Sequence, residues 1–207
     1  MTNAERPKRR FPYILAMLVA SVLLIVGAAV LTIWLPYHRV QTVISGVDAI
    51  GGRTYVVASV PAWMPERVGN KYPKLFDRIS EIDLSYTQAD SAFLRHLSGI
   101  TSPISVRLNY TDVTDEGLAN LRGMTDLEEL SLDDTSVGNA GMQDLAGLSS
   151  LKVLSLANTH VTDAGLKHFA ELTHLEYLCL YGTAVSKDGV EELRTKLPWC
   201  MIVFTFD

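Results

Sequence analysis

The hydrophobic pattern of the chain differs between its two ends. From Phe11 to Tyr37 no residue is charged, and a helix over residues 11–35 would rise about 37 Å at about 1.5 Å per residue. That length exceeds the hydrocarbon core of a bilayer, which is about 30 Å thick. The pattern predicts one transmembrane helix at residues 11–35, ending at Pro36, with aromatic residues at both membrane interfaces.

The charges around this segment predict its direction. Lys8, Arg9 and Arg10 precede it, whereas a lone Arg39 follows it. Because basic flanks stay in the cytoplasm, we expect a single-pass protein with a cytoplasmic amino terminus and an extracytoplasmic repeat region. A signal peptide cleaved near Ala28–Ala29 is the alternative, but the apolar run continues to Leu35, past the usual apolar core of about 7–15 residues.

After residue 81 the apolar positions recur every 24 residues. One column holds Ile82, Val106, Leu130, Leu154, Leu178 and Ile202, and a second holds Leu84, Leu108, Leu132, Leu156 and Leu180. The two columns are two residues apart, so each copy is predicted to contain a short strand with both side chains inward. A threonine column follows at residues 87, 111, 135, 159 and 183. We interpret its hydroxyls as partners for backbone groups at the turn after each strand.

The second half of each copy has helical spacing. Leu118, Leu121 and Met124 are three apart, which places them on one face of a short helix. The predicted N-caps are Asp90, Thr114, Gly138, Thr162 and Ser186, of which only the glycine lacks a side-chain oxygen. A glycine column at residues 117, 141, 165 and 189 predicts that helices of successive copies approach closely.

No copy can bury its apolar face alone, so the copies must stack. Stacked strands lie about 4.8 Å apart, whereas packed helices need about 8–10 Å. This difference predicts a curved stack with parallel strands on its concave side.

These residues resemble the leucine-rich-repeat family, specifically its cysteine-containing subclass with 24-residue repeats. Residues 151–166 match the subclass pattern Leu-x-x-Leu-x-Leu-x-x-Thr-x-Val-Thr-Asp-x-Gly-Leu at every position. The resemblance covers about residues 82–206. It implies an α/β fold, a right-handed leucine-rich-repeat solenoid with parallel strands on the concave face, here preceded by one transmembrane helix. It also implies protein–protein binding, and the order of anchor and repeats is similar to that of bacterial membrane-anchored leucine-rich-repeat proteins.

The predicted domains follow from these patterns. They are a cytoplasmic basic tail (1–10), a transmembrane helix (11–35), a linker and amino-terminal cap (36–81), and a repeat domain of about five repeats plus a terminal strand (82–207). In the cap we expect a helix over Val40–Ile50, a strand over Thr54–Val60, and an irregular, partly helical stretch over Pro61–Asp77. At the far end we expect Trp199 and Phe204 to close the core.

Charge and cysteine content narrow the function. The chain carries a net −5, and because the first ten residues carry +3, the remainder carries −8. This balance argues against binding nucleic acid or anionic lipid surfaces through bulk charge. The two cysteines, Cys179 and Cys200, are too few for a disulfide scaffold, and Cys200 is predicted to be a buried apolar filler. The sequence has no catalytic, cofactor or metal motif, so we expect neither an enzyme nor a cofactor.

The outward-facing strand positions are the candidate binding surface. They change from acidic and polar in the early copies to aromatic in the late ones. The candidate partner-binding residues are Arg107, Glu129, Asp133, Tyr177, Cys179 and Tyr181. We expect a membrane-anchored module that binds an unknown protein through the concave face, where tyrosine would favour contact.

Three alternatives stay open at this point. The outward-facing residues could be solvated strand positions without a partner. The protein could be a structural envelope component that self-associates through its terminal strand, Ile202–Phe206. Catalysis by Cys179 is the third alternative, although its own strand offers no basic residue to activate the thiol.

Overall fold

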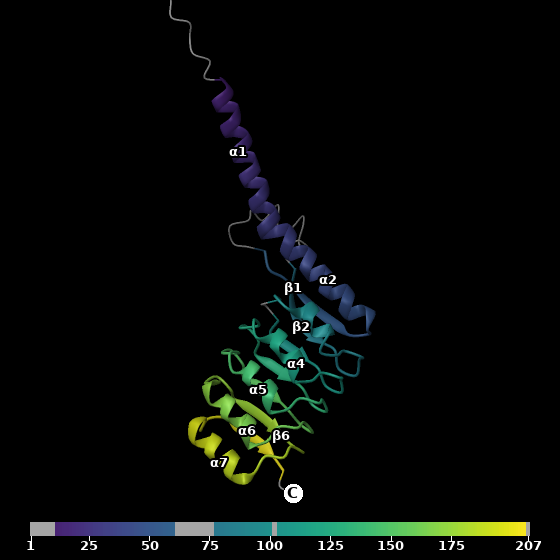
Figure 1. Cartoon of the computed structure of the whole chain (residues 1–207), viewed down its shortest axis with the longest axis vertical. Coiled ribbons are helices and arrows are strands. Elements are labelled where there is room, and N and C mark those ends of the chain that lie inside the picture. Colours follow the sequence, from purple (N-terminus) through teal and green to yellow (C-terminus); the bar gives the residue numbers. More distant parts are fainter. Residues whose placement is uncertain (1–10, 61–76, 101–102, 206–207) are drawn as a thin grey trace, which may run out of the picture.

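The computed structural model describes residues 11–60, 77–100 and 103–205. Figure 1 shows a helical rod at the amino-terminal end that leads into a stack of coils, with the carboxyl terminus at the opposite end. The irregular stretch expected at Pro61–Asp77 lies outside the described residues, except for Asp77 itself.

The rod consists of two α-helices joined by a wider turn. Helix α1 (Phe11–Ala29) passes into a π-helical turn (Val30–Trp34), and α2 (Leu35–Ala49) continues from it. Pro36 therefore does not end the helical path, and that prediction is wrong. The proline lies in the first turn of α2, shortly after the π-helical turn, and the helical path continues through it.

Within the described residues, no helix combines the length and the apolar character that a membrane crossing requires. The transmembrane helix predicted at 11–35 is thus not supported. These residues divide between α1, the π-helical turn and the start of α2 instead of forming one α-helix.

The strands form one seven-stranded sheet in chain order. Strand β1 (Arg53–Ala58) pairs antiparallel with β2 (Asp77–Asp83). The later strands are parallel and comprise β3 (Ser105–Arg107), β4 (Glu129–Ser131), β5 (Val153–Ser155), β6 (Tyr177–Leu180) and β7 (Met201–Phe204). In every parallel strand pair, each residue is matched with the residue 24 positions later, for example Ile82 with Val106. The register confirms the period predicted from the sequence.

The leucine columns form one continuous interior row. Leu108, Leu132 and Leu156 are fully buried. The backbone N–H of Leu108 donates to the carbonyl of Ser131 (2.8 Å), and that of Leu132 donates to the carbonyl of Ser155 (2.9 Å). Each coil is therefore completed by the next one in both its apolar core and its backbone hydrogen bonds, as the stacking argument predicts.

Short helices lie along one side of the stack (Figure 1). They are α4 (Asp115–Leu118), α5 (Asn139–Leu145), α6 (Asp163–Leu166) and α7 (Lys187–Lys196), with 3₁₀ turns at Phe93–Leu97, Ala119–Leu121 and Lys167–Glu171. A Cβ atom added at Gly141 would lie 2.7 Å from Leu118 Cδ1. The predicted close approach of successive helices is confirmed.

The polar columns are structural. In every copy the threonine hydroxyl donates to the carbonyl three residues earlier, at 2.6 or 2.7 Å. The hydroxyls of Thr162 and Ser186 accept hydrogen bonds from the first turns of their helices, as predicted. Thr114 does not cap its helix, because its hydroxyl instead lies 2.9 Å from that of Ser91 in the preceding coil.

Both ends of the stack are capped. At the amino-terminal end α2 places Val43 and Val47 in the core, which confirms the predicted cap helix, and β1 confirms the predicted strand. At the other end Phe204 packs against the core as expected, but Trp199 is 54 % exposed. The prediction for Trp199 is wrong because the adjacent Cys200 occupies the interior position, and Cys200 is buried as predicted.

Candidate functional site

The outward side of β2–β7 is the candidate site, and we call it the strand face. In each strand the middle residue, such as Leu130 or Leu154, points into the core, so the residues on either side of it point outward. The parallel register then aligns these outward residues into columns across the sheet, as for Asp83, Arg107 and Ser131.

The early part of the strand face carries an ion network. Arg107 Nη1 pairs with Glu81 Oε1, and Arg107 Nη2 lies 3.9 Å from Glu129 Oε2. The structure therefore brings together two of the predicted residues, Arg107 and Glu129, and adds Glu81. The three side chains are partly exposed, and such pairs contribute about 0–1 kcal/mol. The ion pairs hold the three charged side chains close together, but they contribute little to stability.

Asp133 is already bound by the next coil. Its Oδ1 accepts hydrogen bonds from the hydroxyl of Ser155 (2.5 Å) and from the backbone N–H of Ala157 (2.8 Å). Asn109 makes the same two contacts one coil earlier, with Ser131 and Asp133. The carboxylate of Asp133 thus joins coils, and its role in partner binding stays a prediction.

The late part of the strand face is apolar and aromatic. Tyr177 and Cys179 are half-buried, and Tyr181 is 53 % exposed. Met201 and Val203 of β7 are paired in register with Tyr177 and Cys179 and are 64 % and 38 % exposed. These two residues were not among the predicted partner-binding residues, because the last strand was expected to close the core or to form an edge for self-association.

The two cysteines differ in environment. Cys179 and Cys200 are both free thiols. Burial raises the pKa of the Cys200 thiol from 9.0 to about 11, because a buried thiolate loses its hydration. Cys200 is therefore a neutral thiol at physiological pH, whereas Cys179 lies on the strand face.

A further column beside the strand face was missed. Tyr86, Tyr110, Asp134 and Asn158 all have φ between 55° and 61°, a conformation that tyrosine adopts infrequently. The rings of Tyr86 and Tyr110 stack with centroids 4.6 Å apart. A hydrogen bond to the Asp134 carboxylate raises the pKa of Tyr110. The 24-residue spacing identifies this column in the sequence, but tyrosine is not a residue type that predicts a turn with positive φ.

The histidines do not form a metal site. Within the described residues no three His, Cys, Asp or Glu side chains are grouped closely enough to hold a metal ion. His174 Nδ1 instead lies 2.9 Å from the carbonyl oxygen of Ser149.

Comparison with known proteins gives one match to a family model. The model described as leucine rich repeat matches residues 147–170, which corresponds to one copy of the repeat. Together with the sheet of parallel strands in 24-residue register, this match supports a leucine-rich-repeat family and an α/β leucine-rich-repeat solenoid. The cysteine-containing subclass, the handedness and the curvature stay predictions. No curated protein sequence matches the chain.

Several solved structures are similar in fold. A leucine-rich-repeat protein of Leptospira interrogans is 21 % identical with a TM-score of 0.45, over 60 % of this chain and 36 % of that one. Internalin C2 of Listeria monocytogenes is 17 % identical with a TM-score of 0.37, over 61 % and 81 % of the two chains. The leucine-rich-repeat ectodomain of the receptor kinase SOBIR1 from Arabidopsis thaliana is 13 % identical with a TM-score of 0.49, over 81 % and 89 %. The chain thus spans about a third of the length of the Leptospira protein.

Proposed function

We propose that the protein is an interaction module that binds another protein through the strand face. The observation that carries the proposal is the concentration of exposed apolar side chains at the late end of that face, where Tyr181, Met201 and Val203 are all accessible. Burying apolar surface contributes about 25 cal/mol per Å². A partner that covered this patch would therefore gain binding energy.

The early end of the face supports specificity. The network of Glu81, Arg107 and Glu129 presents ordered charges on β2, β3 and β4, and β5 separates it from the apolar patch of β6 and β7. Charges at the rim of an interface influence partner choice and association rate more than affinity. We therefore propose that Tyr181, Met201 and Val203, together with the half-buried Tyr177 and Cys179, supply most of the contact area, and that Arg107 and Glu129 select the partner.

Co-purification from native membranes tests this proposal. A partner that is retained by the unchanged protein should be lost by the double variant Tyr177→Ala, Tyr181→Ala. The matched control is Tyr86→Ala, because Tyr86 is 76 % exposed but lies outside the strand face. Retention of the same partners by all three proteins would contradict the assignment.

The proposal also includes attachment to a membrane through residues 11–35. The side chains of Met17, Leu18, Leu23 and Leu24 are exposed, and this stretch has no charged residue. Lipid contact would remove that apolar surface from water. We propose that the basic tail of residues 1–10 stays on the cytoplasmic side and that the repeats lie outside.

An alkaline carbonate wash tests the attachment. The unchanged protein should stay in the membrane pellet, whereas the double variant Leu23→Lys, Leu24→Lys should be released, because lysine is costly inside a bilayer. Tyr86→Lys, which adds charge on the repeats, should stay in the pellet. Release of the unchanged protein would contradict attachment through this segment.

A second candidate function is self-association through β7. This strand ends the sheet, and no strand among the described residues pairs with its outer edge. Edge strands pair readily with other edges, so two copies could join their β7 strands. Sedimentation of the chain in detergent separates the two functions. A dimer that Val203→Lys disrupts and the double variant Tyr177→Ala, Tyr181→Ala keeps would favour self-association through β7, and a monomer at micromolar concentration would exclude it.

A further inference from the structure

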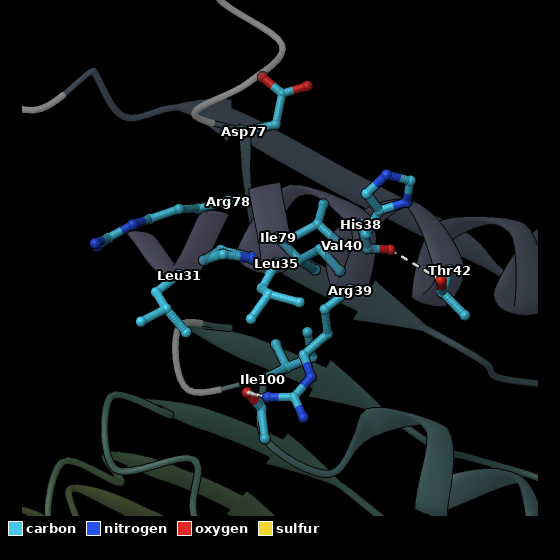
Figure 2. Close-up of a pocket in the computed structure, with 12 residues that line it drawn as sticks. Leu31, Leu35, His38, Arg39, Val40, Thr42, Asp77, Arg78, Ile79 and Ile100 are labelled. Atoms are coloured by element: carbon cyan, nitrogen blue, oxygen red, sulfur yellow. Dashed lines mark hydrogen bonds between the residues drawn. The ribbon is translucent and has the colours of Figure 1, made fainter. Parts of the chain in front are cut away.

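A cleft of about 690 Å³ lies between the start of α2 and the first coil of the repeats. Its walls combine two kinds of side chain. Leu31, Leu35 and Ile100 are aliphatic, and Arg39 and Arg78 are basic. Figure 2 shows Leu31, Leu35 and Arg39 projecting from the helix on the side of Ile100, while Arg78 extends toward the Leu31 end of the cleft. An apolar wall beside two guanidinium groups matches an amphiphile with a negatively charged head.

Arg39 is held in place by the backbone of Gly99. Its Nη1 donates a hydrogen bond to the Gly99 carbonyl at 3.2 Å. A Cβ atom at position 99 would lie 2.5 Å from Nη1 and 2.9 Å from Cζ of Arg39. Gly99 also has a φ of +78°, which favours glycine. The loop therefore leaves room for this guanidinium and fixes it at the wall of the cleft.

The two arginines of the cleft form no ion pair within the described part of the chain. Among the described residues, every ion pair involves other side chains, so neither Arg39 nor Arg78 has an acidic partner within 4.0 Å. Asp77 also lines the cleft, but Figure 2 shows its carboxylate pointing away from Arg39 and Leu35. The cleft is therefore a local positive site in a part of the chain that carries −8 in total.

We propose that this cleft binds one anionic phospholipid. Arg39 supplies positive charge for its phosphate group, Arg78 adds positive charge at the Leu31 end of the cleft, and Leu31 and Leu35 line the path of an acyl chain. Two observations select a lipid as the occupant, namely the charge of the cleft and its continuity with the uncharged segment 11–35. Access to lipid rests on the membrane attachment proposed above. Trp34 and Tyr37 flank the cleft residues in sequence, and both are residue types that favour the headgroup level of a bilayer.

Native mass spectrometry of the full chain in detergent tests the proposal, with phosphatidylglycerol and phosphatidylcholine as the two added lipids. The unchanged protein should retain phosphatidylglycerol in preference to phosphatidylcholine. Each of Arg39→Gln and Arg78→Gln should lower that preference about fivefold, since one basic side chain near anionic lipid has an effect of this size. The matched control is Arg53→Gln, which removes the same charge at the opposite end of β1 from the cleft and should keep the preference.

Three results would overturn the lipid site. The first is equal retention of both lipids by the unchanged protein. The second is an unaltered preference for phosphatidylglycerol in both Arg39→Gln and Arg78→Gln. The third is displacement of phosphatidylglycerol by inorganic phosphate alone. The last result would show that the cleft binds the phosphate group of the lipid without its acyl chain. The detergent experiment does not require α1 to enter a bilayer, so a negative result here is distinguishable from release in the carbonate wash.

Discussion

The threonine column shows how one side chain can repeat the same contact in every coil. Each hydroxyl is buried or nearly so, and each donates to the carbonyl three residues earlier. That carbonyl belongs to the last inward leucine of the strand, for example Leu132 for Thr135. Without the hydroxyl of Thr135, the carbonyl of Leu132 would lose this hydrogen bond, and a buried carbonyl without a partner costs about 1–3 kcal/mol.

Replacement of Thr135 tests this role. Thr135→Val should lower the free energy of unfolding by about 1–3 kcal/mol, while Thr135→Ser, which keeps the hydroxyl, should lose less. Ser136→Ala is the control, because Ser136 is exposed. The measurement is urea unfolding followed by circular dichroism. Equal stability of the valine and serine variants would show that the hydroxyl is not needed.

The buried thiol gives a prediction that depends on pH. The pKa of Cys200 rises from 9.0 to about 11 on folding, so the unfolded chain loses this proton at lower pH than the folded chain. Stability should therefore be unaffected by this group below about pH 9 and should fall between about pH 9 and pH 11. Urea midpoints measured across this range should fall less in Cys200→Val, and an identical fall in both proteins would contradict the assignment.

Individual residues also show where the sequence was insufficient. Alternation along the strand predicted that Asp133 points outward, and Asp133 does lie on the strand face. Its bonds to Ser155 and Ala157 depend on how closely the coils stack, which no local pattern contains. Thr114 is similar, because its partner Ser91 is 23 residues away. Sequence columns identify which residues face the same way, but not which of them touch.

At the scale of elements, the spacing between helices depends on the glycine column. A Cβ atom at Gly141 would lie 2.7 Å from both Asp115 Oδ1 and Leu118 Cδ1, and 3.1 Å from Asp115 Cα. The last of these atoms is backbone, so a rotamer change alone cannot relieve the crowding. The strand pairing on the other side of each coil limits how far α4 and α5 can separate.

Gly141→Ala should therefore destabilise the protein by about 1–3 kcal/mol, although alanine favours a helix more than glycine does. Gly147→Ala is the matched control, because a Cβ atom there meets nothing within 4 Å. Thermal unfolding compares the two variants. A Gly141→Ala protein as stable as the control would show that successive helices can move apart.

The elements of the repeat were predictable because each has a local period. Two-residue alternation specified the strands, and three-residue spacing specified the short helices. The amino-terminal rod was less predictable. Pro36 was expected to end a helix, but it lies in the first turn of α2 and the helical path continues through it. The change to a π-helical turn at Val30–Trp34 has no clear signal in an apolar run.

At the scale of the whole molecule, the surface differs from one end of the sheet to the other. The fold followed from the sequence because a 24-residue period permits only stacked coils. Only part of the candidate site could be predicted from the sequence. Tyr177, Cys179 and Tyr181 were found from their columns, but Met201 and Val203 extend the apolar patch onto the last strand. The cleft beside Arg39 joins segments about 40 to 60 residues apart in the sequence, so no local motif marks it.

Site-specific photocrosslinking in intact cells tests the central claim most directly, because it does not require the partner to be known beforehand. A photoreactive phenylalanine analogue would replace Tyr181 on the strand face, Tyr86 beside it, or Lys167 on the helix side. The account predicts a covalent adduct with another protein at position 181 and none at positions 86 and 167. An adduct at position 167 with none at position 181 would contradict it.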